Sequence, residues 1–131
     1  MSRAAAAKRI QFALAAIFIG LGGWCLVAPL SVERLALRPE FQHLSATSAL
    51  FIACFGAQAV LCGLVIALSE FKPRTFLIFG LVGSAPFFAF NWYFVFVAKM
   101  FTPWMLLDFA GNLGILACGL AGYWLSRPAP S

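Results

Sequence analysis

Residues 46–68 decide the fold of this chain, and they read ATSALFIACFGAQAVLCGLVIAL. The segment contains no Asp, Glu, Lys or Arg, and it is long enough to cross a bilayer, which takes about 20 helical residues. Three similar apolar runs lie at residues 10–28, 76–98 and 104–125. Proline, serine and charged residues separate the runs, which is typical of helix ends. The pattern predicts an all-α membrane protein, an antiparallel bundle of four transmembrane helices in a single domain over residues 1–131.

The composition indicates the same class of protein. Hydrophobic residues make up 63% of the chain and charged residues 10%, whereas soluble domains have about 45–50% and about 25%. A soluble chain of 131 residues cannot enclose so much apolar surface in one core, so lipid must cover it. The nine basic residues, which give a net charge of +5, are spread along the sequence. They form no patch with interleaved aromatics, so we expect contacts with membrane lipids and no nucleic-acid binding.

The basic residues between the runs predict the orientation of the bundle. Six lie on one side of the predicted membrane and three on the other; they are Arg3, Lys8, Arg9, Lys72, Arg74 and Arg127, against Arg34, Arg38 and Lys99. By the positive-inside rule we expect the first side, which holds both termini, to be cytoplasmic. The basic N-terminus imitates a signal peptide, but the run at residues 10–28 is long for one. We therefore expect a retained first helix.

The first external loop, residues 30–45, is the only long loop between the runs. A capping Ser31 is followed by apolar residues at helical spacing, and Pro39 would end the helix. The apolar positions are Val32, Leu35 and Ala36. This segment predicts a short helix that lies at the outer membrane interface.

Several of these features together resemble a known group of proteins. They are a glycine-rich first helix, the Ala28-Pro29 junction, an amphipathic stretch into Leu35-Ala36-Leu37, and three more helices. The chain in this respect looks like the small bacterial DoxX-like four-helix membrane families. The resemblance implies a fold rather than an activity, and we expect the chain in a bacterial inner membrane. Some such proteins carry ionisable pairs in the second helix, where this chain has only Gln58 at mid-depth.

Polar side chains inside the predicted spans are the candidate functional groups, because a polar group in hydrocarbon is costly and usually faces the bundle interior. With about 100° between successive helical residues, one face of each later run collects polar and small residues. The candidate ligand-binding residues on these faces are Asp108, Asn112, Asn91, Gln58 and Trp104. All but Gln58 fall in the outer half of the predicted membrane. On the second run, Gln58 shares its face with Phe51, Cys54 and Val65.

Two interpretations of this polar group remain open. In the first, Asn91 and Asn112 hydrogen-bond to each other and Asp108 pairs with a basic residue such as Lys99, so that the group holds the helices together. In the second, the group lines an outward-facing cavity for an amphiphilic ligand. Buried amides commonly hold membrane bundles together, which favours the first interpretation.

The remaining motifs carry little chemistry. Pro86 is expected to kink the third helix and release the carbonyl of Val82, which Ser84 would help to satisfy. The four cysteines lie in apolar runs without a Cys-x-x-Cys pair and are interpreted as small packing residues. With His43 as the single histidine, a metal site is not expected. No base lies predictably beside a nucleophile, so neither catalytic residues nor a cofactor are predicted.

Three functions are compatible with this pattern. The first is a non-enzymatic accessory or structural subunit of a larger membrane complex or a homo-oligomer, and the lack of visible chemistry favours it. The second is a binder or carrier of a lipophilic or amphiphilic molecule in the outer polar pocket. The third is an enzyme that modifies a lipid or quinone with Asp108 as acid or base, but no second proton-transfer group has an assured position.

Overall fold

The computed structural model describes residues 2–127, and four long helices dominate this range. In chain order the helical elements are α1 (Arg3–Val27), α2 (Pro29–Ala36), the 3₁₀ turn η1 (Pro39–Phe41), α3 (Ala46–Leu68), α4 (Pro73–Trp92), the π-helix η2 (Tyr93–Val97), the 3₁₀ turn η3 (Pro103–Met105) and α5 (Leu106–Ser126). The helical stretches Arg3–Val27, Ala46–Leu68, Pro73–Val97 and Pro103–Ser126 are each long and apolar enough to cross a membrane. The prediction of an all-α protein with four membrane-spanning helices is therefore confirmed.

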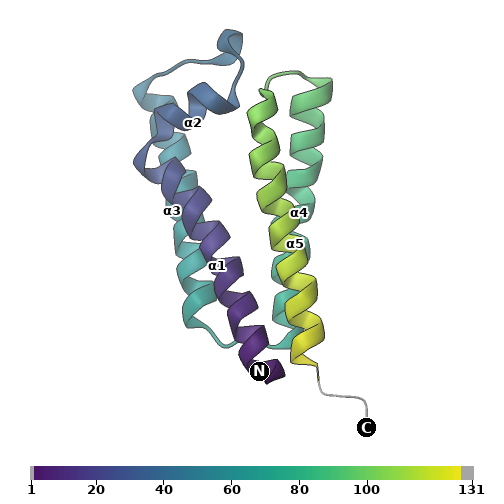
Figure 1. Ribbon diagram of the computed structural model, residues 1–131. Coiled ribbons are helices and arrows are strands. Elements are labelled where there is room, and N and C mark those ends of the chain that lie inside the picture. The colour runs from purple at the N-terminus through teal and green to yellow at the C-terminus, as the bar shows by residue number, and fades with distance from the viewer. Residues whose placement is uncertain (1, 128–131) are drawn as a thin grey trace.

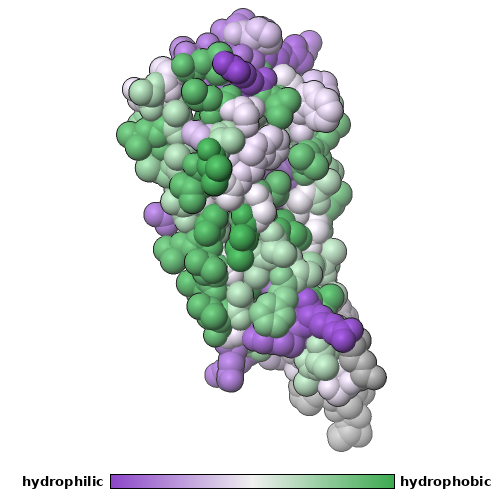
Figure 2. All heavy atoms as spheres, turned by 60° about the vertical axis from the view of Figure 1, so that its left-hand side comes forward, coloured by the Kyte–Doolittle hydropathy of each residue, from purple (hydrophilic) through white to green (hydrophobic). Residues whose placement is uncertain are grey.

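The four spans are arranged as two pairs. Helix α1 packs against α3, α4 packs against α5, and the pairs meet along α1 and α5. In Figure 1 the pairs lie close together at the end that holds both termini and diverge toward the end that holds α2. We call these the terminal end and the α2 end. Figure 2 shows hydrophilic residues gathered at both ends, with a mainly apolar surface between them.

Helix α1 begins well before the predicted start of the first run. It starts at Arg3, and the side chain of Ser2 caps it by accepting a hydrogen bond from the amide of Ala5 at 3.2 Å. The residues before the apolar run are mostly alanines, which are the strongest helix formers. A search for apolar runs misses such a start because it measures hydropathy and not helix propensity.

The helix predicted in the first external loop is present as α2, but Ser31 does not cap it. The helix begins at Pro29, which occupies the first turn, where proline is well tolerated. The hydroxyl of Ser31 instead donates to the carbonyl of Ala28 at 2.9 Å and accepts from the indole of Trp24 at 3.0 Å. Ser31 therefore ties α2 to the end of α1.

Close approach of backbones holds each helix pair together. A Cβ atom on Gly56 of α3 would lie 2.5 Å from the carbonyl oxygen of Gly22 on α1, and one on Gly80 of α4 would lie 2.8 Å from the Cα of Gly119 on α5. Real Cβ atoms do not come so close, so only glycine fits at these crossings. From the middle of the bundle to the terminal end, the interior is filled by large buried side chains, namely Leu14, Ile66, Phe76 and Ile115.

The face that α3 buries is not the one the polar pattern predicted. Phe51, Cys54, Gln58 and Val65 are exposed on the surface of the chain, whereas Gly56, Gly63 and Ile66 are buried. The prediction assumed that one polar side chain orients a membrane helix toward the interior. In α3 the small residues orient it instead, because they allow closer packing against α1.

Helix α4 is continuous from Pro73 to Trp92, with Pro86 inside it. The hydroxyl of Ser84 donates to the carbonyl of Gly80 at 2.6 Å, so the predicted use of Ser84 near the carbonyl of Val82 is wrong. A serine in a helix commonly reaches the carbonyl four residues before it. The last turn of this span widens into the π-helix η2, where the amide of Ala98 bonds to the carbonyl of Tyr93 at 2.8 Å.

Main-chain hydrogen bonds join the two diverging pairs at the α2 end. The amide of Arg38 donates to the carbonyl of Met100 at 2.9 Å, and the amide of Thr102 donates to the carbonyl of Ala36 at 2.8 Å. Between them, Leu37 and Phe101 form an isolated antiparallel bridge. We call this contact of residues 36–38 with residues 100–102 the α2 junction.

Candidate functional site

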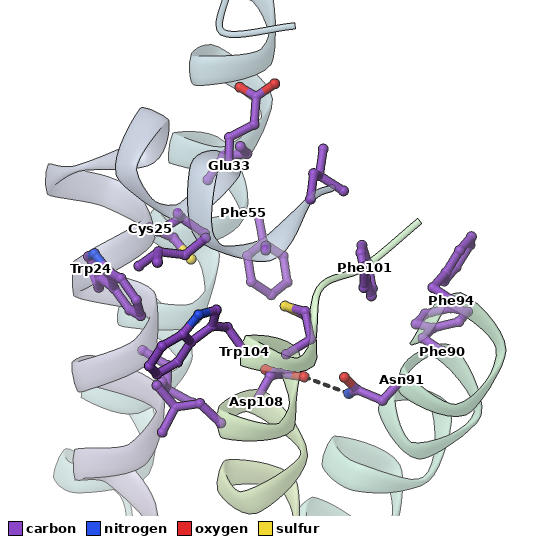
Figure 3. Close-up of a pocket in the computed structure, with 18 of the residues that line it drawn as sticks. Trp24, Cys25, Glu33, Phe55, Phe90, Asn91, Phe94, Phe101, Trp104 and Asp108 are labelled. Carbon is purple, nitrogen blue, oxygen red and sulfur yellow. Dashed lines mark hydrogen bonds between the residues drawn. The ribbon is translucent and has the colours of Figure 1, made fainter. Parts of the chain in front are cut away.

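A cavity of about 470 Å³ lies at the α2 end between the two helix pairs. Small-molecule sites in proteins commonly have volumes of about 300–1,000 Å³. Its walls come from all four spans, from α2 and from the segment before α5, as Figure 3 shows. The walls are mainly apolar and rich in aromatic rings, including Trp24, Phe55, Phe87, Phe90, Phe94, Phe101 and Trp104.

The polar part of the cavity is built around Asp108, in the first turn of α5. Its Oδ2 accepts a hydrogen bond from Nδ2 of Asn91 on α4 at 2.8 Å, and another from Nδ2 of Asn112 on α5 at 2.9 Å. The second N–H of each amide goes to the main chain, at Phe87 and at Asp108 itself. Both amide nitrogens thus use both of their protons.

This arrangement corrects the first interpretation of the polar group. The two asparagines do not bond to each other; both donate to the one carboxylate that lies between them. Within residues 2–127 the carboxylate has these amides as partners, in place of the basic side chain that the sequence suggested. Amides on facing and adjacent turns reach Asp108 directly, so the group needs no long basic side chain to hold it.

Three side-chain oxygen atoms of the group accept no hydrogen bond within the described residues, namely Oδ1 of Asn91, of Asp108 and of Asn112, and the first two belong to residues that line the cavity. Oδ1 of Asn91 is enclosed, and it has no hydrogen-bond partner within the described part of the chain. The amide cannot be turned the other way, because its nitrogen lies between two acceptors, the Phe87 carbonyl and Asp108. The hydrogen bonds of the Asp108 side chain, again among described residues, all fall on Oδ2, which leaves Oδ1 for a group in the cavity.

The structure brings four of the five candidate residues together. Asp108, Asn91 and Trp104 line the cavity. Asn112 is buried behind Asp108 and holds it in place. Gln58 does not belong to this group, since it is exposed on α3 and does not line the cavity.

Glu33 of α2 also lines the cavity, and the sequence did not reveal it. Its side chain is 1% exposed and accepts three hydrogen bonds, from the amides of His43 and Leu44 at 2.7 and 3.0 Å and from the hydroxyl of Ser48 at 2.6 Å. The bond from Ser48, followed by that from Leu44, holds the pKa of Glu33 below its usual value. Glu33 is therefore a charged anchor between α2 and the start of α3.

The sequence contained only a weak signal for this role of Glu33. Glu33 is the single acid in a short amphipathic helix, where an acidic side chain is commonly solvated. Its partners are backbone amides about ten residues further on, and the conformation of the intervening loop brings them within reach. Leu44 there has a φ of 46°, a value that is uncommon for a residue other than glycine.

The arrangement combines one carboxylate, two amides and many apolar side chains. Within residues 2–127, no three His, Cys, Asp or Glu side chains lie close enough together to hold a metal ion. The four cysteines, all in the described range, are free. Asp108 is held by two amides in a mainly apolar chamber, which suits the polar end of an otherwise apolar molecule.

Comparison of the chain with protein-family models, with curated proteins and with solved structures finds no match.

Proposed function

We propose that this protein binds an amphiphilic molecule in the cavity at its α2 end. The observation that carries the proposal is the combination of a chamber of about 470 Å³, mainly apolar walls and a fixed carboxylate with an open oxygen. A bundle that only needed mutual support between helices would fill this space with side chains, as the terminal end does. An apolar body would occupy the chamber, and a polar group would meet Asp108.

A pair of cysteine substitutions tests this proposal. Cys25 lines the cavity, whereas Cys54 is exposed on α3 outside it. We expect Cys25→Phe to fill the chamber and remove a copurifying lipophilic molecule, while Cys54→Phe retains it. The measurement is mass spectrometry of small molecules and lipids in gently solubilised protein, with circular dichroism to check that both variants remain folded. Equal ligand content in the two variants would argue against a site in the cavity.

We also propose that the terminal end faces the cytoplasm of a bacterium and that the cavity opens on the outer side of the inner membrane. The support is the excess of basic residues at the terminal end, six against three. A reporter that is active only outside the cytoplasm, fused after Ser131, should be silent. Activity of that fusion would reverse the orientation and turn the cavity inward.

A second candidate function is that of a non-enzymatic subunit in a larger membrane assembly or a homo-oligomer. The observation that favours it is Gln58, a polar side chain exposed near the middle of a membrane-spanning helix. Lipid offers an amide no hydrogen bonds, and a second helix would provide them. Native mass spectrometry should then detect a partner at fixed stoichiometry, and Gln58→Leu should weaken that association. A wild-type protein that remains monomeric in gentle detergent would exclude this role.

A further inference from the structure

The charges around the cavity are unusual for this chain. The protein has nine basic and four acidic residues, yet the cavity wall includes two of the acids, Glu33 and Asp108. No Lys, Arg or His is among the described residues that line it. Arg38 is not a lining residue, and at the α2 junction its side chain donates to the carbonyl of Phe101 at 3.2 Å. Of the two carboxylates, that of Glu33 is turned toward residues 43–48 and that of Asp108 faces the chamber, so Asp108 is the charge that a bound molecule would meet.

On the carboxylates and amides around the cavity, the hydrogen-bonding groups that remain open are acceptors. The amide nitrogens of Asn91 and Asn112 are fully used, and the carboxylate of Glu33 is occupied by three donors. What remains is Oδ1 of Asp108 and, enclosed beside it, Oδ1 of Asn91, which has no partner in the described range. Both atoms are acceptors, so a polar group bound at Asp108 must bring a hydrogen-bond donor. The indole N–H of Trp104, which has no partner among the described residues, is an open donor elsewhere in the lining. Figure 3 shows Asn91 and Asp108 side by side at the floor of the chamber.

The walls suit a cation as well as they suit an apolar body. Trp104 lies over the same part of the chamber as Asp108. The faces of aromatic rings attract cations, most strongly when water is excluded. An ammonium group here would have the carboxylate of Asp108 on one side and the indole of Trp104 on another.

We propose that the molecule held in this cavity is a lipophilic amine, bound in its protonated form with an N–H donated to Oδ1 of Asp108. This inference rests on the proposed function, because it assigns the chemical class of the ligand to the same site. Carboxylates, phosphates and other anionic amphiphiles are disfavoured by the carboxylate of Asp108. Alcohols can donate a hydrogen bond to Asp108 but do not neutralise its charge.

Three probes with the same hydrocarbon chain test the assignment: dodecylamine, dodecanol and dodecanoate. The full chain is placed in nanodiscs of zwitterionic lipid, and binding is followed by tryptophan fluorescence, with empty nanodiscs as the blank for partitioning. We expect dodecylamine to bind about 10- to 100-fold more tightly than dodecanol, because a charge-assisted hydrogen bond replaces a neutral one. Dodecanoate should bind more weakly than either.

Two variants that each remove one negative charge at the α2 end provide the control. Asp108→Asn keeps an acceptor for Asn91 and Asn112, and it should abolish the preference for the amine while leaving helicity and melting temperature nearly unchanged. Glu40→Gln changes an exposed residue outside the cavity and should leave the preference intact. An effect of equal size in both variants would mean that surface charge, and not the site, selects the amine.

The possible failures are distinguishable. If amine and alcohol bind equally well and Cys25→Phe blocks both, the cavity binds amphiphiles but the assignment to amines is wrong. If the preference for the amine survives in Asp108→Asn, the assignment is wrong as well. If none of the three probes binds the wild-type protein above the blank, both the assignment and the proposed function are overturned.

Discussion

The terminal half of the bundle and its α2 half use the same four spans but are packed differently. In the terminal half, α4 meets α5 at a glycine crossing, Gly80 against Gly119, and large apolar side chains fill the interior. In the α2 half the pairs diverge, and the space between them holds a polar group and a cavity. The same helices thus provide rigidity at one end and a chamber at the other.

The comparison separates the packing within a helix pair from the packing between the pairs. Within each pair, small residues on both facing helices allow their backbones to touch, at Gly22 and Gly56 in the α2 half as at Gly80 and Gly119 in the terminal half. Between the pairs at the α2 end lie large aromatic side chains, such as Phe55 and Phe87 with ring centroids 6.4 Å apart. Substitutions in each half should therefore have effects of different size.

The largest effect is expected from Gly119→Val in the terminal half. The added side chain would collide with the backbone of α4 at Gly80, which cannot move without separating the pair. We expect a loss of about 3 kcal/mol in unfolding free energy, measured by helicity during titration with a denaturing detergent. Gly20→Val is the matched control, because a Cβ at Gly20 meets nothing within 4 Å. A similar loss in both variants would point to helix propensity instead of packing.

The next effect concerns the polar group in the α2 half. Asp108→Leu removes the acceptor of one N–H on each of Asn91 and Asn112, so we expect a loss of about 2 kcal/mol. Asp108→Asn retains an acceptor oxygen and should cost less than about 1 kcal/mol. Thermal unfolding of both variants in detergent measures the difference. Equal stability of Asp108→Leu and the wild type would show that the amides find other partners.

A smaller, pH-dependent effect is expected from Glu33. Its pKa in the folded protein is lowered, so its charged form stabilises the fold at pH values above about 4.3, the usual pKa of glutamate. This contribution is lost as the pH falls through the lowered pKa of the folded state. Glu33→Gln should be less stable than the wild type at neutral pH, and the difference should shrink in acid. Melting temperatures between neutral pH and pH 3 test this, with exposed Glu40→Gln as the variant expected to follow the wild type.

The smallest expected effect is a difference in stability between substitutions of two glutamines in membrane-spanning helices. Gln11 of α1 is buried, and its Nε2 donates to the carbonyls of Ile66 and Ser69 at the end of α3. Gln11→Leu should cost about 1 kcal/mol, a modest loss because Lys8 still reaches Ser69 at 3.4 Å. Gln58→Leu changes an exposed residue and should not lower the stability of the monomer. Detergent unfolding of the two variants side by side gives the comparison, and an equal loss would contradict it.

The sequence predicted the spans well and the packing only in part. Hydropathy located four spans because the lipid requirement is a property of each segment by itself. Helical projection correctly gave the inward face of α5, where Asn112, Ile115, Gly119 and Gly122 are buried. The same projection gave the wrong inward face for α3, because the face that α3 buries depends on how its surface fits the surface of α1. A single helix does not contain that information.

The sequence predicted most residues of the candidate site but not the hydrogen bonds between them. Asp108, Asn91 and Asn112 were recognised because each is a polar group inside an apolar run. Their hydrogen-bond pattern depends on the rotation of α4 against α5, which the glycine crossing sets. The roles of Glu33 and Gln11 were missed because most of their hydrogen-bond partners are main-chain atoms. Every residue has these atoms, so the pattern of side chains does not reveal such a bond.

The α2 junction also determines when the two helix pairs can move apart at the α2 end. The two helix pairs cannot separate at the α2 end unless the bonds from Arg38 to Met100 and from Thr102 to Ala36 break. We therefore expect the amides of Arg38 and Thr102 to exchange with deuterium at similar rates, because one opening event exposes both. An occupant that packs against both pairs would slow the two rates together. Deuterium uptake at this pair of amides thus reports on how long the two helix pairs stay joined at the α2 end.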